Sequence, residues 1–149
     1  MKKVLFLILV IFLLVGCGKK DSTDIGGAMD VLNKHLTAYV TYDYESYCDS
    51  ILPEAIDIEF GSIELCNEDM MDFFQGNNIE AEYAIDDYAL LNQEEYDVLV
   101  NVLVDKYGIE ESKIKDIYDF NFRLIYPDEE SKFNIYVGYI NDNWYVITY

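Results

Sequence analysis

An uninterrupted apolar run opens the chain. Val4 to Val15 contains twelve apolar residues and directly follows the basic pair Lys2 and Lys3. As a helix, twelve residues span about 18 Å, which is too short to cross the ~30 Å hydrocarbon core of a bilayer. A positive start followed by an apolar run of this length is typical of a secretory signal peptide. The pattern therefore predicts export.

Helical spacing of apolar residues dominates the next part of the chain. Residues 28–42 predict an amphipathic helix, and a second short helix is expected from 43 to about 51, where Pro53 stops it. A third helix is expected over 62–74, with Ser62 as its N-cap. These three segments predict a helical first half.

The pattern then changes to alternation. Apolar and polar residues alternate over 79–85, which predicts a strand with one exposed face. Asn92 and Glu95 resemble a capping box at the start of a fourth helix, and Gly108 is placed to end it. A strand and a further helix are therefore expected between the N-terminal helices and the last third.

The last third alternates throughout. Strands are expected at 118–126, 133–139 and 144–149. Polar turns at 127–130 and 141–143 separate them, and Gly138 inside a strand predicts a bend or bulge. The order predicts one α+β domain over 28–149, with N-terminal helices packed on a curved, mainly antiparallel sheet.

The junction Leu14-Val15-Gly16-Cys17 resembles the lipobox of bacterial lipoproteins. The resemblance implies that residues 1–16 are a signal peptide and that Cys17 carries a diacylglyceryl group at the new N-terminus. Residues 17–27 then form a polar, glycine-containing tether. Acyl chains would hold the protein at the extracytoplasmic face of the cell membrane, inner or outer in a two-membrane cell. An ordinary cleaved signal and an uncleaved anchor are the alternatives.

The charge narrows the range of partners. The chain has 29 acidic and 10 basic residues, a formal net charge of −19. Nucleic acid is excluded as an expected partner because phosphate binding needs the opposite sign. We interpret the acidity as solubility at a cell surface, with binding of cations or of a basic partner as the alternative.

Cys48 and Cys66 remain after Cys17 is assigned to the anchor. In an exported protein a pair of cysteines is a disulfide candidate, but both also lie in apolar helical patterns where a free cysteine packs as a small hydrophobe. The sequence leaves both interpretations open.

No metal or cofactor is expected. The chain has one histidine and no CxxC motif, so a zinc site lacks ligands. Acidic residues of the third predicted helix are interpreted as a solvated face, with a weak calcium site as the alternative. These residues are Glu64, Glu68, Asp69 and Asp72.

Two stretches, "LNKHLTAYVTYDYESYCDSI" and "FNIYVGYINDNWYVITY", resemble the opening and the close of nuclear-transport-factor-like and cystatin-like domains. The resemblance implies a cone-shaped fold with an internal pocket. The residues expected to line it are His35, Tyr39, Tyr83, Asp119, Phe120, Phe122 and Trp144. A cone filled by Phe120, Phe122 and Trp144 would contradict a pocket. His35 itself is interpreted as a hydrogen-bonded boundary residue, with a ligand-contacting or catalytic role as the alternative.

These observations predict a lipid-anchored, non-catalytic module that binds a small ligand, an envelope protein or a second copy of itself. One alternative is an accessory subunit of a cell-envelope machine. The other is an isomerase or dehydratase that uses the cone cavity. No residue is assigned as catalytic, because no local spacing links His35 to a second chemical group.

Overall fold

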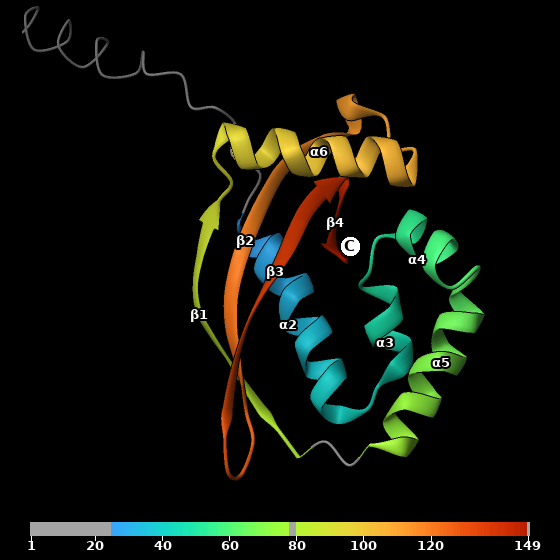
Figure 1. Cartoon of the computed structure of the whole chain (residues 1–149), viewed down its shortest axis with the longest axis vertical. Coiled ribbons are helices and arrows are strands. Elements are labelled where there is room, and N and C mark those ends of the chain that lie inside the picture. Colours follow the sequence, from blue (N-terminus) through green and yellow to red (C-terminus); the bar gives the residue numbers. More distant parts are fainter. Residues whose placement is uncertain (1–24, 78–79, 149) are drawn as a thin grey trace, which may run out of the picture.

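The computed structural model describes residues 25–77 and 80–148 (Figure 1). The lipobox, Cys17 and most of the predicted tether lie outside the described residues, as does the start of the strand expected from 79. The helices are α2 (Ile25–Thr41), α3 (Tyr44–Asp49), α4 (Pro53–Glu59), α5 (Ile63–Gly76), α6 (Gln93–Tyr107) and the short 3-10 helix η1 (Glu111–Lys113). The strands are β1 (Glu82–Leu90), β2 (Ile114–Ile125), β3 (Glu130–Ile140) and β4 (Asn143–Ile147).

The strands form one antiparallel sheet in the order β1-β2-β3-β4, so each pairs with its neighbour in the chain. One edge is covered, because Ile51 forms a parallel bridge with Val146 on β4. The other edge is β1, which has no second strand beside it within the described residues.

Helices cover the sheet unevenly. Helix α2 packs on one face, against side chains that alternate along β2. The buried residues of α3, α4 and α5 share a second core cluster with α6. Helix α6 crosses one end of the sheet and packs with Ile117, Ile140 and Ile147, which belong to the opposite face. The rest of that opposite face is polar: Arg123 there binds Asp86 at 2.8 Å. The prediction of an α+β fold with helices packed on an antiparallel sheet is confirmed.

Local signals placed α6 correctly. The Asn92 side chain accepts from the Glu95 N–H at 3.1 Å, and the Glu95 carboxylate accepts from the Asn92 N–H at 3.3 Å. Gly108 ends the helix in the left-handed region at φ 70°, which a residue without a Cβ adopts at little cost.

One helix was missed and one strand end was wrong. Helix α3 ends at Asp49, before Pro53 as expected, but Pro53 then begins a further helix, α4, because proline fits the first turn of a helix, where its missing N–H costs no hydrogen bond. Strand β1 extends to Leu90 rather than ending near 85. A register shift between Ile85 and Asp87 interrupts the alternation, so the periodicity reverses phase within one strand.

The irregularity expected at Gly138 lies on the neighbouring strand. The register shifts between Ile114 and Ile117 of β2, opposite the segment from Gly138 to Ile140. A Cβ at Gly138 would lie 2.9 Å from Cδ1 of Ile147. This glycine therefore allows close packing of isoleucines over β3, and the extra residue belongs to β2.

Candidate functional site

A cavity of about 240 Å³ lies between α2, α3 and the covered face of β2 and β3. Its lining residues are His35, Leu36, Tyr39, Tyr47, Phe122, Leu124, Tyr126, Phe133 and Ile135. Helical spacing brings the three α2 residues to one face, and period-2 alternation does the same for the strand residues. No Asp, Glu, Lys or Arg lines the cavity.

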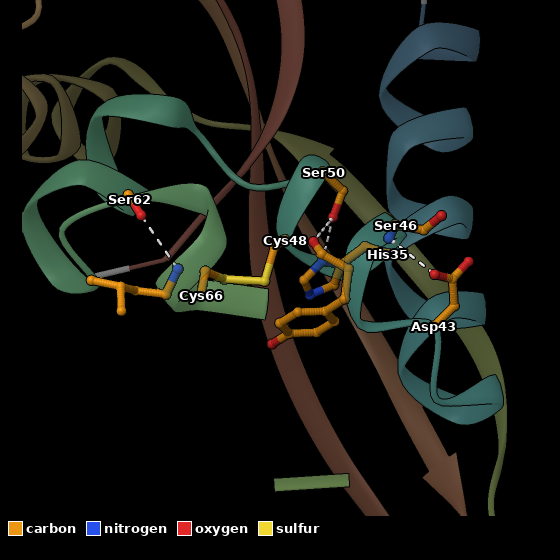
Figure 2. Close-up of a disulfide and its surroundings, with 9 residues drawn as sticks. His35, Asp43, Ser46, Cys48, Ser50, Ser62 and Cys66 are labelled. Atoms are coloured by element: carbon orange, nitrogen blue, oxygen red, sulfur yellow. Dashed lines mark hydrogen bonds between the residues drawn. A yellow bond between two sulfur atoms is a disulfide. The ribbon is translucent and has the colours of Figure 1, made fainter. Parts of the chain in front are cut away.

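His35 forms the polar part of the cavity wall. The ring is 4% exposed and stacks on the Tyr47 ring with centroids 4.2 Å apart. Its Nδ1 lies 2.7 Å from Oγ of Ser50, which is itself buried (Figure 2). The Ser50 hydroxyl donates to the Tyr47 carbonyl at 2.6 Å. A chain of hydrogen bonds therefore ties α2 to α3 directly behind the cavity.

Burial keeps the ring neutral. It lowers the pKa of His35 from 6.5 to about 4, and the opposing effect of a hydrogen bond to the Tyr47 backbone is smaller. Burial likewise raises the pKa of Tyr47 to about 12. Both groups are uncharged at neutral pH.

An aromatic wall supports this site from behind. Phe74 of α5 is buried and contacts Tyr39 and Tyr47 with ring centroids 5.9 and 6.3 Å apart. Tyr39 also forms a side-chain hydrogen bond with Tyr126, and burial, the largest cause, raises its pKa. The rings of α2 and α3 at the cavity are thus held by α5.

Cys48 and Cys66 are joined in a disulfide that links α3 to α5 (Figure 2). Both residues are fully buried. The bond lies beside Tyr47 in the sequence and therefore helps to fix the helix that carries the stacked ring. The pairing that the sequence left open is present in the structure.

Of the residues expected to line a pocket, His35, Tyr39 and Phe122 do so. Phe120 instead is fully buried in the core. Trp144 packs against Tyr118 at 6.0 Å between ring centroids and against α2, where a Cβ at Gly27 would overlap the indole. We call the part built from Tyr118, Phe120 and Trp144 the closed end of the α2–sheet interface, and the cavity its open end.

The other two expected residues lie elsewhere. The Tyr83 hydroxyl lies between β1 and α2, 3.1 Å from Oδ1 of Asn33, and does not reach the cavity. Asp119 lies on the opposite face of β2, because its neighbours Tyr118 and Phe120 both face α2. Burial raises its pKa, and its Oδ1 is buried without a hydrogen-bond partner.

Several lining residues were missed by the sequence reasoning. Leu124 is two positions from Phe122, and Phe133 pairs with Phe122 across β2 and β3, so strand alternation could have found both. Tyr47 had no such signal, because only the packing of α3 against α2 brings it onto His35.

The described residues contain no cluster of three His, Cys, Asp or Glu side chains that could hold a metal ion. Among the same residues, no helix has the length and apolar character needed to cross a membrane.

Comparison with known proteins adds no identity. No protein-family model, no curated protein and no solved structure matches this chain.

Proposed function

We propose that this chain is a lipid-anchored extracytoplasmic protein that binds a small, largely apolar molecule in the open end of the α2–sheet interface. The cavity there is the observation that carries the proposal, because it is lined by apolar and aromatic side chains around one buried histidine. Ligand sites in proteins are typically apolar hollows with a few placed polar groups.

The size of the cavity limits the ligand. An apolar cavity of about 150 Å³ is large enough for benzene, whereas drug-sized ligands need about 300 Å³ or more. At about 240 Å³, this cavity fits a single ring with a few further atoms. Phe133 is 45% exposed at the cavity, so a longer substituent can extend past it into solvent.

The state of His35 favours binding over acid–base catalysis. A general base works best when its pKa lies near the working pH. Burial lowers the pKa of His35 to about 4, which makes the ring a weak base at neutral pH. The isomerase or dehydratase alternative therefore has less support than a binding function.

The fold also fits the proposal. A helix packed on one face of a four-stranded antiparallel sheet, with a cavity between helix and sheet, is what a cystatin-like or nuclear-transport-factor-like cone would provide. In this interpretation the closed end is the tip of the cone and the open end its mouth. Folds of this type do not by themselves select a function.

Binding can be tested with fluorobenzene, followed by its ¹⁹F signal, on the mature chain in lipid nanodiscs. Empty nanodiscs measure partition into lipid. Ile135→Trp adds a large ring at the cavity wall and is expected to abolish saturable binding. Equal saturable binding by both chains would place the ligand elsewhere and contradict the proposal.

Anchoring has a separate test. Cys17→Ser removes the thiol that a diacylglyceryl group would modify. We expect this variant to leave the membrane fraction or to accumulate as uncut precursor. A mature, membrane-bound Cys17→Ser protein would refute the lipobox interpretation.

The exposed edge of β1 favours a second candidate function, protein binding as an accessory subunit. The β4 edge is closed by residues 50–52, where the Leu52 N–H donates to the Val146 carbonyl at 3.0 Å. At β1, in contrast, no second strand is paired within the described residues, a groove of about 620 Å³ lies between β1 and α2, and Tyr88 and Leu90 are half exposed. An unpaired strand edge of this kind can accept a strand from another chain.

Charge favours a basic extended segment of an envelope protein over a second copy of this chain. Strand β1 carries Glu82, Asp86 and Asp87, so pairing two copies would bring like charges together. A peptide of alternating Lys and Val is the test ligand, measured by fluorescence anisotropy. Glu82→Lys should weaken its binding and Asp105→Lys on α6 should not. Equal weakening by both would indicate a nonspecific charge effect.

A further inference from the structure

We propose that the ligand of the open end is uncharged and carries one hydrogen-bond donor, a hydroxyl or N–H on a ring-sized apolar body, which binds the Nε2 atom of His35. This inference rests on the proposed function and names the class of ligand for the same cavity.

A count of protons identifies the tautomer of His35. A serine hydroxyl has one proton to donate. Ser50 gives that proton to the Tyr47 carbonyl at 2.6 Å, so its oxygen can only accept at 2.7 Å from His35 Nδ1. Nδ1 therefore carries the ring proton. Because burial also keeps the imidazole neutral, Nε2 holds a lone pair and is an acceptor.

The ring of His35 borders the cavity, and its contacts are to Ser50 Oγ at Nδ1, to the Tyr47 backbone and to the Tyr47 ring. Because Nδ1 is held by Ser50, we infer that Nε2 is the ring nitrogen that a ligand in the cavity meets.

The other polar atoms of the wall are the hydroxyls of its three tyrosines. The side chains of Tyr39 and Tyr126 form a hydrogen bond with each other. The Tyr47 ring stacks on His35 and presents its face to it. Each tyrosine hydroxyl both donates and accepts, whereas the unprotonated nitrogen of neutral His35 only accepts, so we assign His35 as the partner of a ligand donor.

Cationic and anionic ligands are both disfavoured. An ion moved into an apolar cavity needs a charged partner, and no Asp, Glu, Lys or Arg lines this one. An anion would in addition approach a chain of net charge −19. A neutral phenol-like or alcohol-like molecule needs no charged partner in the cavity and is not repelled by the negative chain.

The test compares two ligands of the same ring size, 4-fluorophenol and fluorobenzene, by ¹⁹F titration of the mature chain in nanodiscs. A hydrogen bond to Nε2 is expected to make 4-fluorophenol bind about tenfold more tightly than fluorobenzene. His35→Phe removes the acceptor and should remove this preference, while His35→Gln, which keeps an acceptor oxygen, should restore part of it.

The outcomes separate this inference from the function on which it rests. Equal binding of both ligands to the unmodified chain would overturn the donor proposal and leave the pocket intact. Binding of neither ligand above the Ile135→Trp background would overturn both. A preference that persists in His35→Phe would show that another group holds the donor.

A second measurement needs no substitution at His35. In a ¹H–¹⁵N spectrum of the imidazole, Nε2 should carry the signature of an unprotonated nitrogen and should shift when 4-fluorophenol is added. Fluorobenzene should leave it nearly unchanged. Finding the proton on Nε2 in the ligand-free chain would contradict the proposal. Ser50 is a positioning residue, because it bonds His35 and does not line the cavity. Ser50→Ala should therefore change the ratio of the two His35 tautomers although it removes no contact with the ligand.

Discussion

The two ends of the α2–sheet interface are built from the same helix and the same strands, yet one is solid and the other hollow. At the closed end, Phe120 and Val137 are fully buried and Trp144 packs directly on the α2 backbone at Gly27. At the open end, Ile135 and Phe133 continue the same face of β3 but border a cavity. The alternation of side chains is therefore not what makes the difference.

The contrast lies in what covers each end. At the closed end, glycine at position 27 lets the helix approach, so large rings fill the space. At the open end, α2 carries His35 and Tyr39, and α3 and α5 hold them from behind through a disulfide and aromatic contacts. The single histidine of the sequence, hydrogen-bonded to the buried Ser50, lies at the hollow end. A ligand site requires both a cavity and a polar group in its wall, and the open end has the two together.

The largest predicted effect comes from removing a ring at the closed end. Phe120→Ala should lower the free energy of unfolding by about 3–5 kcal/mol, because a fully buried ring leaves a cavity. Phe133→Ala at the open end should cost less than about 1 kcal/mol, since that ring is 45% exposed. Urea unfolding of both variants measures the difference. Similar losses would mean that the two ends are packed alike.

Removal of the disulfide should cause the next largest loss in the free energy of unfolding. Its loop of 18 residues corresponds to about 3 kcal/mol in the chain-entropy treatment. Cys48→Ala together with Cys66→Ala should cost that amount and also weaken binding of 4-fluorophenol, because α3 carries Tyr47. A double variant of full affinity would show that α3 is held in place without the bond.

Much of this architecture follows from local rules. Alternation along β2 and β3 and the capping box of α6 were sufficient to place those elements. The same alternation excludes Asp119 from the face of Phe120 and Phe122, so that misassignment was avoidable from the sequence.

Other features depend on contacts between distant segments. The position of Tyr47 over His35 comes from helix packing and from the Cys48–Cys66 bond, neither of which a local pattern encodes. The bulge near Asp86 reversed the phase of β1 and hid its second half. The cavity itself is a difference in packed volume, to which hydrophobic periodicity is insensitive.

Acid should destabilise the open end through His35. In the unfolded chain the ring titrates near pH 6.5, whereas in the folded chain burial lowers the pKa to about 4. Between these values the unfolded chain binds more protons, so stability falls as the pH is lowered from 7 and levels off below 4. From pH 7 to pH 5 the loss attributable to this group is about 2 kcal/mol.

His35→Leu is the matched control, because it keeps a side chain of similar bulk and takes up no proton. The carboxylates contribute to both chains and cancel in the difference. Tyr47 stacks on the ring and Tyr39 lines the same cavity, and both, with pKa values raised by burial, stay neutral over this range. Identical pH profiles for the two chains would mean that His35 takes up a proton as readily in the folded chain as in the unfolded chain, and would contradict the prediction.

The smallest effect is expected from filling the open end. Ile135→Trp places extra volume where space exists, so the free energy of unfolding should change by less than about 1 kcal/mol. Val137→Trp, two residues further along the same face, should cost about 1–3 kcal/mol because that position is fully packed. Thermal unfolding of both chains makes the comparison, and equal losses would argue against free volume at Ile135.

The most direct measurement of the central claim is a methyl NMR titration of the mature chain with 4-fluorophenol. Shifts should be confined to the methyl groups of Leu36, Leu124 and Ile135, which line the cavity, while those of Leu32, Val137 and Val146 at the closed end stay in place. Shifts centred on the closed end, or spread evenly over both ends, would contradict a ligand site at His35.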